Sequence, residues 1–253
     1  MNFVLAMLAR NFAVERRSLR TGFLRMVLQP AVYIFVFGYV VGRMLPGGST
    51  GNYAQVMAPG VLAITLLSTP QLVVGSSILS GFYFRTMEAW LLAPVTLRAI
   101  LAALVVCGTL YGSINGLVVV ALIWAILGIV PEHPWLLVYF ILVGSLFFSL
   151  LAVSVLLLPS TPRQGQEVFS FLMMPMTFFG CTFYSFSMLQ PPFSWLALCL
   201  PTTYLSEGLR AAYLTGESAL SLGMITIGLP FITISLFPVA DRTMAHRLSN
   251  FTW

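Results

Sequence analysis

The chain has 253 residues, of which 59% are hydrophobic and only 8% charged. A soluble domain carries roughly 25% charged residues, so this chain has too little polar surface to stay dissolved as a globule. The composition excludes a soluble enzyme and a disordered chain, and three cysteines exclude a disulfide scaffold. It predicts an all-α polytopic membrane protein, with a ceiling of about seven spans at about 20 residues each.

All twelve basic residues are Arg, and the sequence contains no Lys. A P-loop needs a Lys on the phosphates and a pyridoxal enzyme needs a Schiff-base Lys, so both chemistries are excluded. A GC-rich genome would also favour Arg over Lys, but the exclusion holds either way. If the protein uses ATP, a partner must hydrolyse it. The three cysteines and two histidines are widely spaced and form no metal-binding motif.

The N-terminal segment, residues 1–22, is predicted to form an amphipathic helix in the membrane interface. Its apolar stripe contains Leu5, Leu8, Phe12 and Leu19, and a second stripe contains Arg10, Arg17 and Arg20. The alternative is an N-terminal tail that supplies only a positive-inside signal. Residues 3–9 are apolar but too short to span, and the charge follows them, so this is not a signal peptide.

Six transmembrane helices are predicted in one domain over residues 1–253. The expected spans are residues 23–44, 53–79, 99–129, 135–158, 168–186 and 220–239, with a short tail after the last. With the N-terminus inside, ten arginines fall on the cytoplasmic side and two, Arg43 and Arg210, outside. This asymmetry predicts that both termini are cytoplasmic and that the number of spans is even.

The loop between spans two and three, residues 81–98, is predicted to be cytoplasmic. Arg85 and Glu88 stand three apart, while Leu91 and Leu92 supply an apolar patch and Pro94 ends the helix. This pattern is typical of a short amphipathic helix on which a partner protein docks. The alternative is a connector held among the lipid headgroups by aromatic side chains.

The segment 189–216 is too apolar to be solvated and is broken by prolines. It is predicted to form a re-entrant hairpin in the outer leaflet, which is tolerated only when packed against protein. Glu207 and Arg210 are three residues apart and suitably spaced to pair. The alternative is an outer interfacial helix with aromatic anchors.

Small residues at four-residue spacing predict close helix contacts. Gly108, Gly112 and Gly116 form two overlapping G-x-x-x-G units, and Gly38 and Gly42 form another. We interpret them as packing within the bundle, with a dimer contact as the alternative.

Carboxylates are nearly absent from the predicted spans. Glu167, at the inner end of the fifth, is four residues after Arg163 and is expected to pair with it. Carriers coupled to protons or sodium usually place carboxylates at mid-membrane, so the sequence disfavours a gradient-driven transporter. Nor does it contain a filter-like loop or the paired catalytic groups of an intramembrane enzyme.

Taken in order, several pieces of the chain resemble the ABC-2-type permeases, the membrane subunits of bacterial exporters of drugs, polysaccharides and glycolipids. They are the Arg-rich N-terminal helix, Pro59-Gly60, the R-x-x-E-x-x-L-x-A-P-V stretch from Arg85 to Val95, residues 175–192, P-x-x-Y from Pro201 to Tyr204, and Gly208 to Arg210.

The resemblance implies roles for particular residues. The coupling helix that docks on the ATPase would be residues 82–95, and the interfacial helix, residues 3–20, would also touch the ATPase; residues 189–214 would form the outer re-entrant helices. The expected ATPase-coupling residues are Phe82, Arg85, Glu88, Leu91, Leu92, Arg17 and Arg20. The expected substrate-pathway residues are Tyr33, Phe37, Thr65, Ser68, Thr69, Met173, Met176 and Phe179.

The resemblance also implies an assembly in the bacterial cytoplasmic (inner) membrane. Two permeases, a homodimer or a heterodimer, would work with two copies of a separate ABC ATPase that binds ATP and Mg²⁺. This chain itself would bind no cofactor and no nucleic acid, and would not be an enzyme. Methionines at 173, 174 and 176 favour an amphiphilic or lipid-like substrate. The expected substrate is a drug, glycolipid or oligosaccharide that is moved out of the cytoplasm or the inner leaflet. The alternative is a gradient-driven transporter or flippase without an ATPase.

Overall fold

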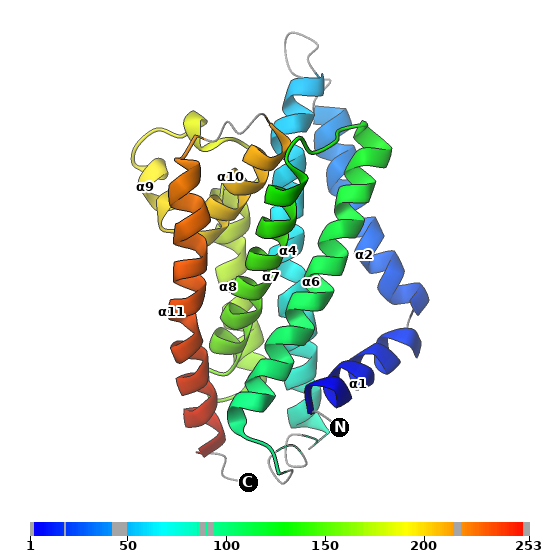
Figure 1. Ribbon diagram of the computed structural model, residues 1–253, viewed down its shortest axis with the longest axis vertical. Coiled ribbons are helices and arrows are strands. Elements are labelled where there is room, and N and C mark those ends of the chain that lie inside the picture. The colour runs from blue at the N-terminus through cyan, green and yellow to red at the C-terminus, as the bar shows by residue number, and fades with distance from the viewer. Residues whose placement is uncertain are drawn as a thin grey trace.

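The computed structural model describes residues 3–17, 19–41, 50–84, 86, 90, 94–214 and 219–249, and these are almost entirely helical (Figure 1). The chain forms, in order, α1 (Phe3–Arg17), α2 (Leu19–Tyr33), η1 (Ile34–Val41), α4 (Thr50–Tyr83), α6 (Leu97–Leu127), α7 (Pro134–Leu156), α8 (Pro162–Phe179), η2 (Phe186–Met188), α9 (Phe193–Leu198), α10 (Pro201–Tyr213) and α11 (Leu222–Ser249).

Four of the described helices are long and apolar enough to cross a membrane, namely α4, α6, α7 and α11. A shorter apolar helix covers Met26–Gly38, in α2 and η1. The fifth predicted span corresponds to α8, which has 18 residues and is therefore about 27 Å long. The structure thus confirms an all-helical membrane protein, and the count of six spans stays a prediction.

Several helix ends differ from those predicted, for local reasons. α8 begins at Pro162 rather than 168, because the Thr161 side chain caps it by accepting a hydrogen bond from the Gln164 backbone N–H (3.3 Å). It ends at Phe179 rather than 186, because the backbone at Cys181 is left-handed (φ 55°). α11 continues to Ser249, so the predicted tail is helical as far as the structure describes it.

α4 lies in the middle of the bundle and packs against α6, α7, α8 and α10 (Figure 1). It stays helical through Pro59 and Pro70. α11 covers one side and leaves large apolar side chains such as Phe231 exposed, as expected where lipid is the neighbour. α1 crosses one end of the bundle obliquely, where Met7 is buried and α1 packs against α6.

The glycines of α6 bring it close to its neighbours inside the bundle. A Cβ added at Gly108 would lie 2.6 Å from the Ser149 Oγ, and one at Gly112 would lie 2.9 Å from both the Pro70 Cγ and the Ser145 Oγ. Such distances are shorter than van der Waals contact. These contacts confirm that the small-residue spacing serves packing within the bundle; Gly42 lies outside the described residues.

Gly112→Val is therefore expected to lower the free energy of unfolding by roughly 1–3 kcal/mol, because the added methyl groups would force α6 away from α4 and α7. The measurement is the thermal midpoint of the detergent-purified protein. Gly228→Ala is the control, since a Cβ there meets nothing within 4 Å. A midpoint that is equal in the two variants would contradict this account of the packing.

Candidate functional site

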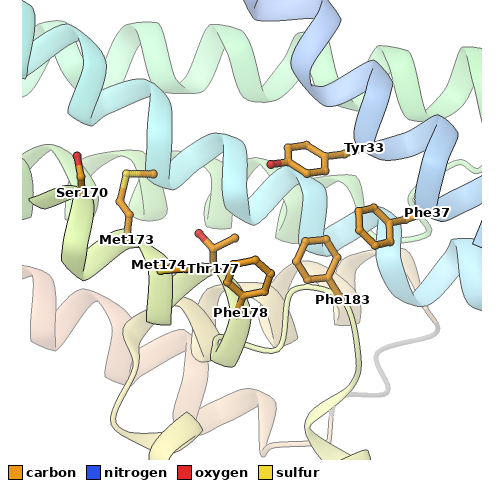
Figure 2. Close-up of a pocket in the computed structure, with 8 residues that line it drawn as sticks. All are labelled: Tyr33, Phe37, Ser170, Met173, Met174, Thr177, Phe178 and Phe183. Carbon is orange, nitrogen blue, oxygen red and sulfur yellow. The ribbon is translucent and has the colours of Figure 1, made fainter.

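An apolar groove of about 380 Å³ lies between α2 with η1 on one side and α8 on the other (Figure 2). Eight residues line it: Tyr33, Phe37, Ser170, Met173, Met174, Thr177, Phe178 and Phe183. None of the eight carries a charge, and four are aromatic. The groove is therefore suited to an apolar chain or ring rather than to an ion.

Four aromatic side chains gather at one end of the groove. The rings of Phe37 and Phe183 lie 4.8 Å apart between centroids, and Tyr33 stacks on Phe37 at 6.2 Å. Phe178 lies 6.2 Å from Phe183. Figure 2 shows this cluster at one end and Ser170 at the other. Because α8 ends at Phe179, the aromatic end lies toward α9 and α10.

The structure places three of the eight expected pathway residues in this groove, namely Tyr33, Phe37 and Met173. The other five do not line it. Met176 is buried in the core, and the Phe179 ring stacks on Phe193 of α9 at 6.4 Å.

Of the polar residues of α4 among these five, Thr65 and Thr69 are buried and Ser68 is half-buried. Thr65 is buried and donates to the Val61 carbonyl one turn earlier (2.9 Å), and Ser68 donates to the Thr65 carbonyl (3.3 Å). Thr69 accepts a hydrogen bond from the Asn115 side-chain amide of α6 (2.7 Å). Their hydrogen bonds thus belong to the helix backbone and to the α4–α6 contact.

Glu207 and Arg210, the predicted pair, form an ion pair inside the protein. Glu207 is 0% exposed and Arg210 2% exposed, so neither charge reaches solvent. Their surroundings supply further hydrogen bonds, which makes such burial tolerable. By contrast, the predicted pair Arg163–Glu167 is confirmed (3.3 Å) but exposed on α8.

Two glycines allow the segment after α8, residues 180–185, to approach its neighbours. A Cβ added at Gly60 of α4 would overlap the Thr182 carbonyl oxygen, and one at Gly180 would overlap the Thr202 Oγ1. The glycine of the Pro59-Gly60 pair is thus explained by close backbone contact. This contact brings Phe183 to the groove.

Part of the predicted ATPase-docking region can be placed at the end of the bundle away from α9 and α10 (Figure 1). Phe82 belongs to the last turn of α4, so the helix boundary differs from the expected start of a separate helix at 82. The Arg247 guanidinium of α11 lies over its ring (5.9 Å), and that of Arg10 lies over Trp90 (5.0 Å). Arg98 pairs with Asp241 (3.3 Å).

The remaining docking residues are not placed in detail. Arg17 ends α1 and Arg20 lies in the first turn of α2, but the described part of the chain does not include their side chains. Arg85, Glu88, Leu91 and Leu92 lie outside the described residues. Their role as the docking surface stays a prediction.

The expected pathway residues did not include five of the eight groove residues, namely Ser170, Met174, Thr177, Phe178 and Phe183. Helical spacing gives a signal for four, because residues 170, 173, 174, 177 and 178 of α8 follow one face at intervals of three and four. Phe183 follows the end of α8, so no periodicity could have indicated it.

The fold is that of a polytopic helical membrane protein, and the apolar groove lies between its helices. The ABC-2 type transporter family model matches residues 2–214, nearly the whole chain. The protein therefore belongs to the ABC-2 type transporter family and is an ABC transporter membrane subunit.

Two relatives illustrate the family. The inner membrane transport permease YadH of Escherichia coli (strain K12) is 28% identical over 191 residues, covering 74% of this chain and 73% of that protein. Nodulation protein J of Azorhizobium caulinodans is 27% identical over 171 residues, covering 66% and 64%. These similarities agree with a multi-pass protein of the inner membrane.

Proposed function

We propose that this chain is the membrane subunit of an ATP-driven exporter that moves an amphiphilic or lipid-like substrate out of the cytoplasm or the inner leaflet. A separate ABC ATPase, in two copies, binds ATP and Mg²⁺ and supplies the energy. The observation that carries the substrate class is the groove: its eight lining residues are uncharged and mostly apolar. Its methionines, 173 and 174, are flexible and adapt to irregular shapes.

A second permease copy, identical or closely related, completes the pathway in this proposal. The groove is an open cleft rather than an enclosed cavity. The faces of α2, η1 and α8 beside it expose large apolar side chains. These are Val32, Phe35, Phe171, Met174 and Phe178. A partner subunit facing these helices would enclose the groove and cover them.

The gradient-driven alternative has less support. The sequences of α4, α6 and α7 contain no Asp or Glu. The buried Glu207 pairs with Arg210 and accepts two backbone hydrogen bonds, so both of its oxygens are already bound by protein groups. ATP binding in the partner is therefore the energy source we propose. It would bring the two coupling helices together and shift the spans between inward- and outward-facing states.

The energy source can be tested in inside-out membrane vesicles that contain the chain and the ABC ATPase that co-purifies with it. An NBD-labelled amphiphile is the probe, and we expect ATP-dependent accumulation that survives a protonophore. Accumulation driven by a proton gradient after ATP is removed would contradict the proposal.

The docking region has its own test. Arg85→Ala combined with Glu88→Ala is expected to reduce probe transport roughly tenfold, the effect of losing about 1.4 kcal/mol of contact energy. Expression of the chain and basal ATP hydrolysis should persist. The matched control is Arg163→Ala with Glu167→Ala, an exposed pair on the same predicted side of the membrane. Unchanged transport in the first double variant would show that this loop is not the docking site.

A further inference from the structure

The segment 180–185 leaves the helix α8 while still packed inside the protein. Its Cys181 has φ 55°, a left-handed conformation that is unfavourable for residues other than glycine. Backbone groups in such a segment lose their helical partners, and they must be hydrogen-bonded elsewhere when water is excluded.

Arg210 of α10 holds the segment 180–185 by donating hydrogen bonds to its backbone carbonyls. One guanidinium nitrogen, Nη2, donates to the carbonyls of Cys181 (3.0 Å) and Tyr184 (3.1 Å). Nε and Nη2 also donate to the Val56 carbonyl of α4, each at 3.1 Å. A single side chain therefore ties α10, α4 and the segment together.

Glu207 fixes the Arg210 guanidinium and also binds two backbone N–H groups outside α10. Its Oε1 pairs with Arg210 and accepts the backbone N–H of Phe186 (2.9 Å), while Oε2 accepts the N–H of Ala219 (3.2 Å). We call these two residues, Glu207 and Arg210, the clasp. Because both are buried, each charge depends on the other for its stability.

Between the two held carbonyls, those of Cys181 and Tyr184, lies Phe183. Its ring points into the groove and lies against Phe37 and Phe178, as Figure 2 shows. The clasp thus fixes the backbone on both sides of one aromatic ring, at the end of the groove nearest α9 and α10.

We propose that Phe183 closes this end of the groove to water and sets which substrates pass it, and that Arg210 is its positioning residue. This inference rests on the proposed function, since it assumes that substrate uses the groove. Because the carbonyls of Cys181 and Tyr184 are held by Arg210, the backbone that carries the ring keeps its position as long as the clasp is intact. Lys could not replace Arg210, because an ammonium lacks the planar fork that reaches several carbonyls at once.

The test is the labelling rate of a cysteine placed in the groove, Thr177→Cys, by a membrane-impermeant maleimide. The full chain is purified in lipid nanodiscs, with Cys107→Ala, Cys181→Gly and Cys199→Ala in the background; glycine suits the left-handed backbone at 181. Adding Phe183→Ala is expected to speed labelling about tenfold, because the groove end opens to water. Phe183→Trp should keep it slow.

Arg210→Lys should speed labelling as Phe183→Ala does, although the ring itself is unchanged. Phe231→Ala on the exposed face of α11 is the control and should leave the rate at its starting value. Equal labelling rates with and without Phe183→Ala would overturn the closure, and a folded Arg210→Lys protein that labels slowly would overturn the positioning role. If Arg210→Lys does not fold, the Phe183 variants still decide whether the groove is closed. No ATPase is needed, so the result is independent of whether ATP drives transport.

Discussion

Glu207→Ala is expected to lower the free energy of unfolding by about 3–5 kcal/mol, because it leaves the Arg210 guanidinium buried without a counter-charge. It also removes the acceptor of the Phe186 and Ala219 backbone N–H groups. The expected observation is a large fall in the thermal midpoint of the purified protein, or loss of the monodisperse species.

The exposed pair Arg163–Glu167 provides a matched control. Glu167→Ala should cost well under about 1 kcal/mol, since exposed pairs gain little from their attraction. The double variant Glu207→Met with Arg210→Met should remain unstable, because the carbonyls of Val56, Cys181 and Tyr184 lose their donor. Recovery of wild-type stability in that double variant would show that the pair matters only through its charges.

Gly60→Ala should destabilise the protein by roughly 3 kcal/mol or more, an unusually large effect for one methyl group. The new Cβ would overlap the carbonyl oxygen of Thr182, and a backbone group cannot move aside as a flexible side chain can. Phe183 follows Thr182, so the shift would also displace one ring of the groove. The measurement is the thermal midpoint, together with the labelling rate of Thr177→Cys.

Gly75→Ala, on the same helix, is the control for this substitution. The nearest atom to a Cβ at 75 is the Gln166 side-chain oxygen, 3.4 Å away, which is ordinary contact. Because alanine favours helix more than glycine by about 1 kcal/mol, Gly75→Ala should be neutral or stabilising. Similar losses at both positions would contradict the close approach of the segment to α4.

Much of the bundle could be predicted from the sequence, because apolar runs of membrane length end at local signals. α6 is an example: the Thr96 side chain accepts a hydrogen bond from the Ala99 N–H at its start, and Gly128 with φ 70° ends it. The predicted ends of α8 and α11 were wrong, because hydropathy shows neither a capping side chain nor a helix that continues through charged residues. His246, in the short tail predicted after the last span, lies in α11 for the same reason.

The site was less accessible to sequence reasoning. The spacing of Glu207 and Arg210 indicated a pair, but their burial depends on Val56, Cys181 and Tyr184, which are distant in sequence. Groove residues on α8 follow helical spacing, yet one sequence does not show which face of a helix meets its neighbours. Tyr33, Phe37 and Met173 were selected together with five residues that face elsewhere.

In the proposed function, this membrane subunit works with a separate ATPase. The most direct measurement is to purify the tagged chain from its own membranes in mild detergent and to identify what co-elutes, with the subunit ratio determined by native mass spectrometry. We expect an ABC ATPase in equal numbers with the permease, two copies of each, and ATP hydrolysis in the eluted complex. A chain that transports the amphiphile with no ATPase bound or required would show that it is not the membrane subunit of an ATP-driven exporter.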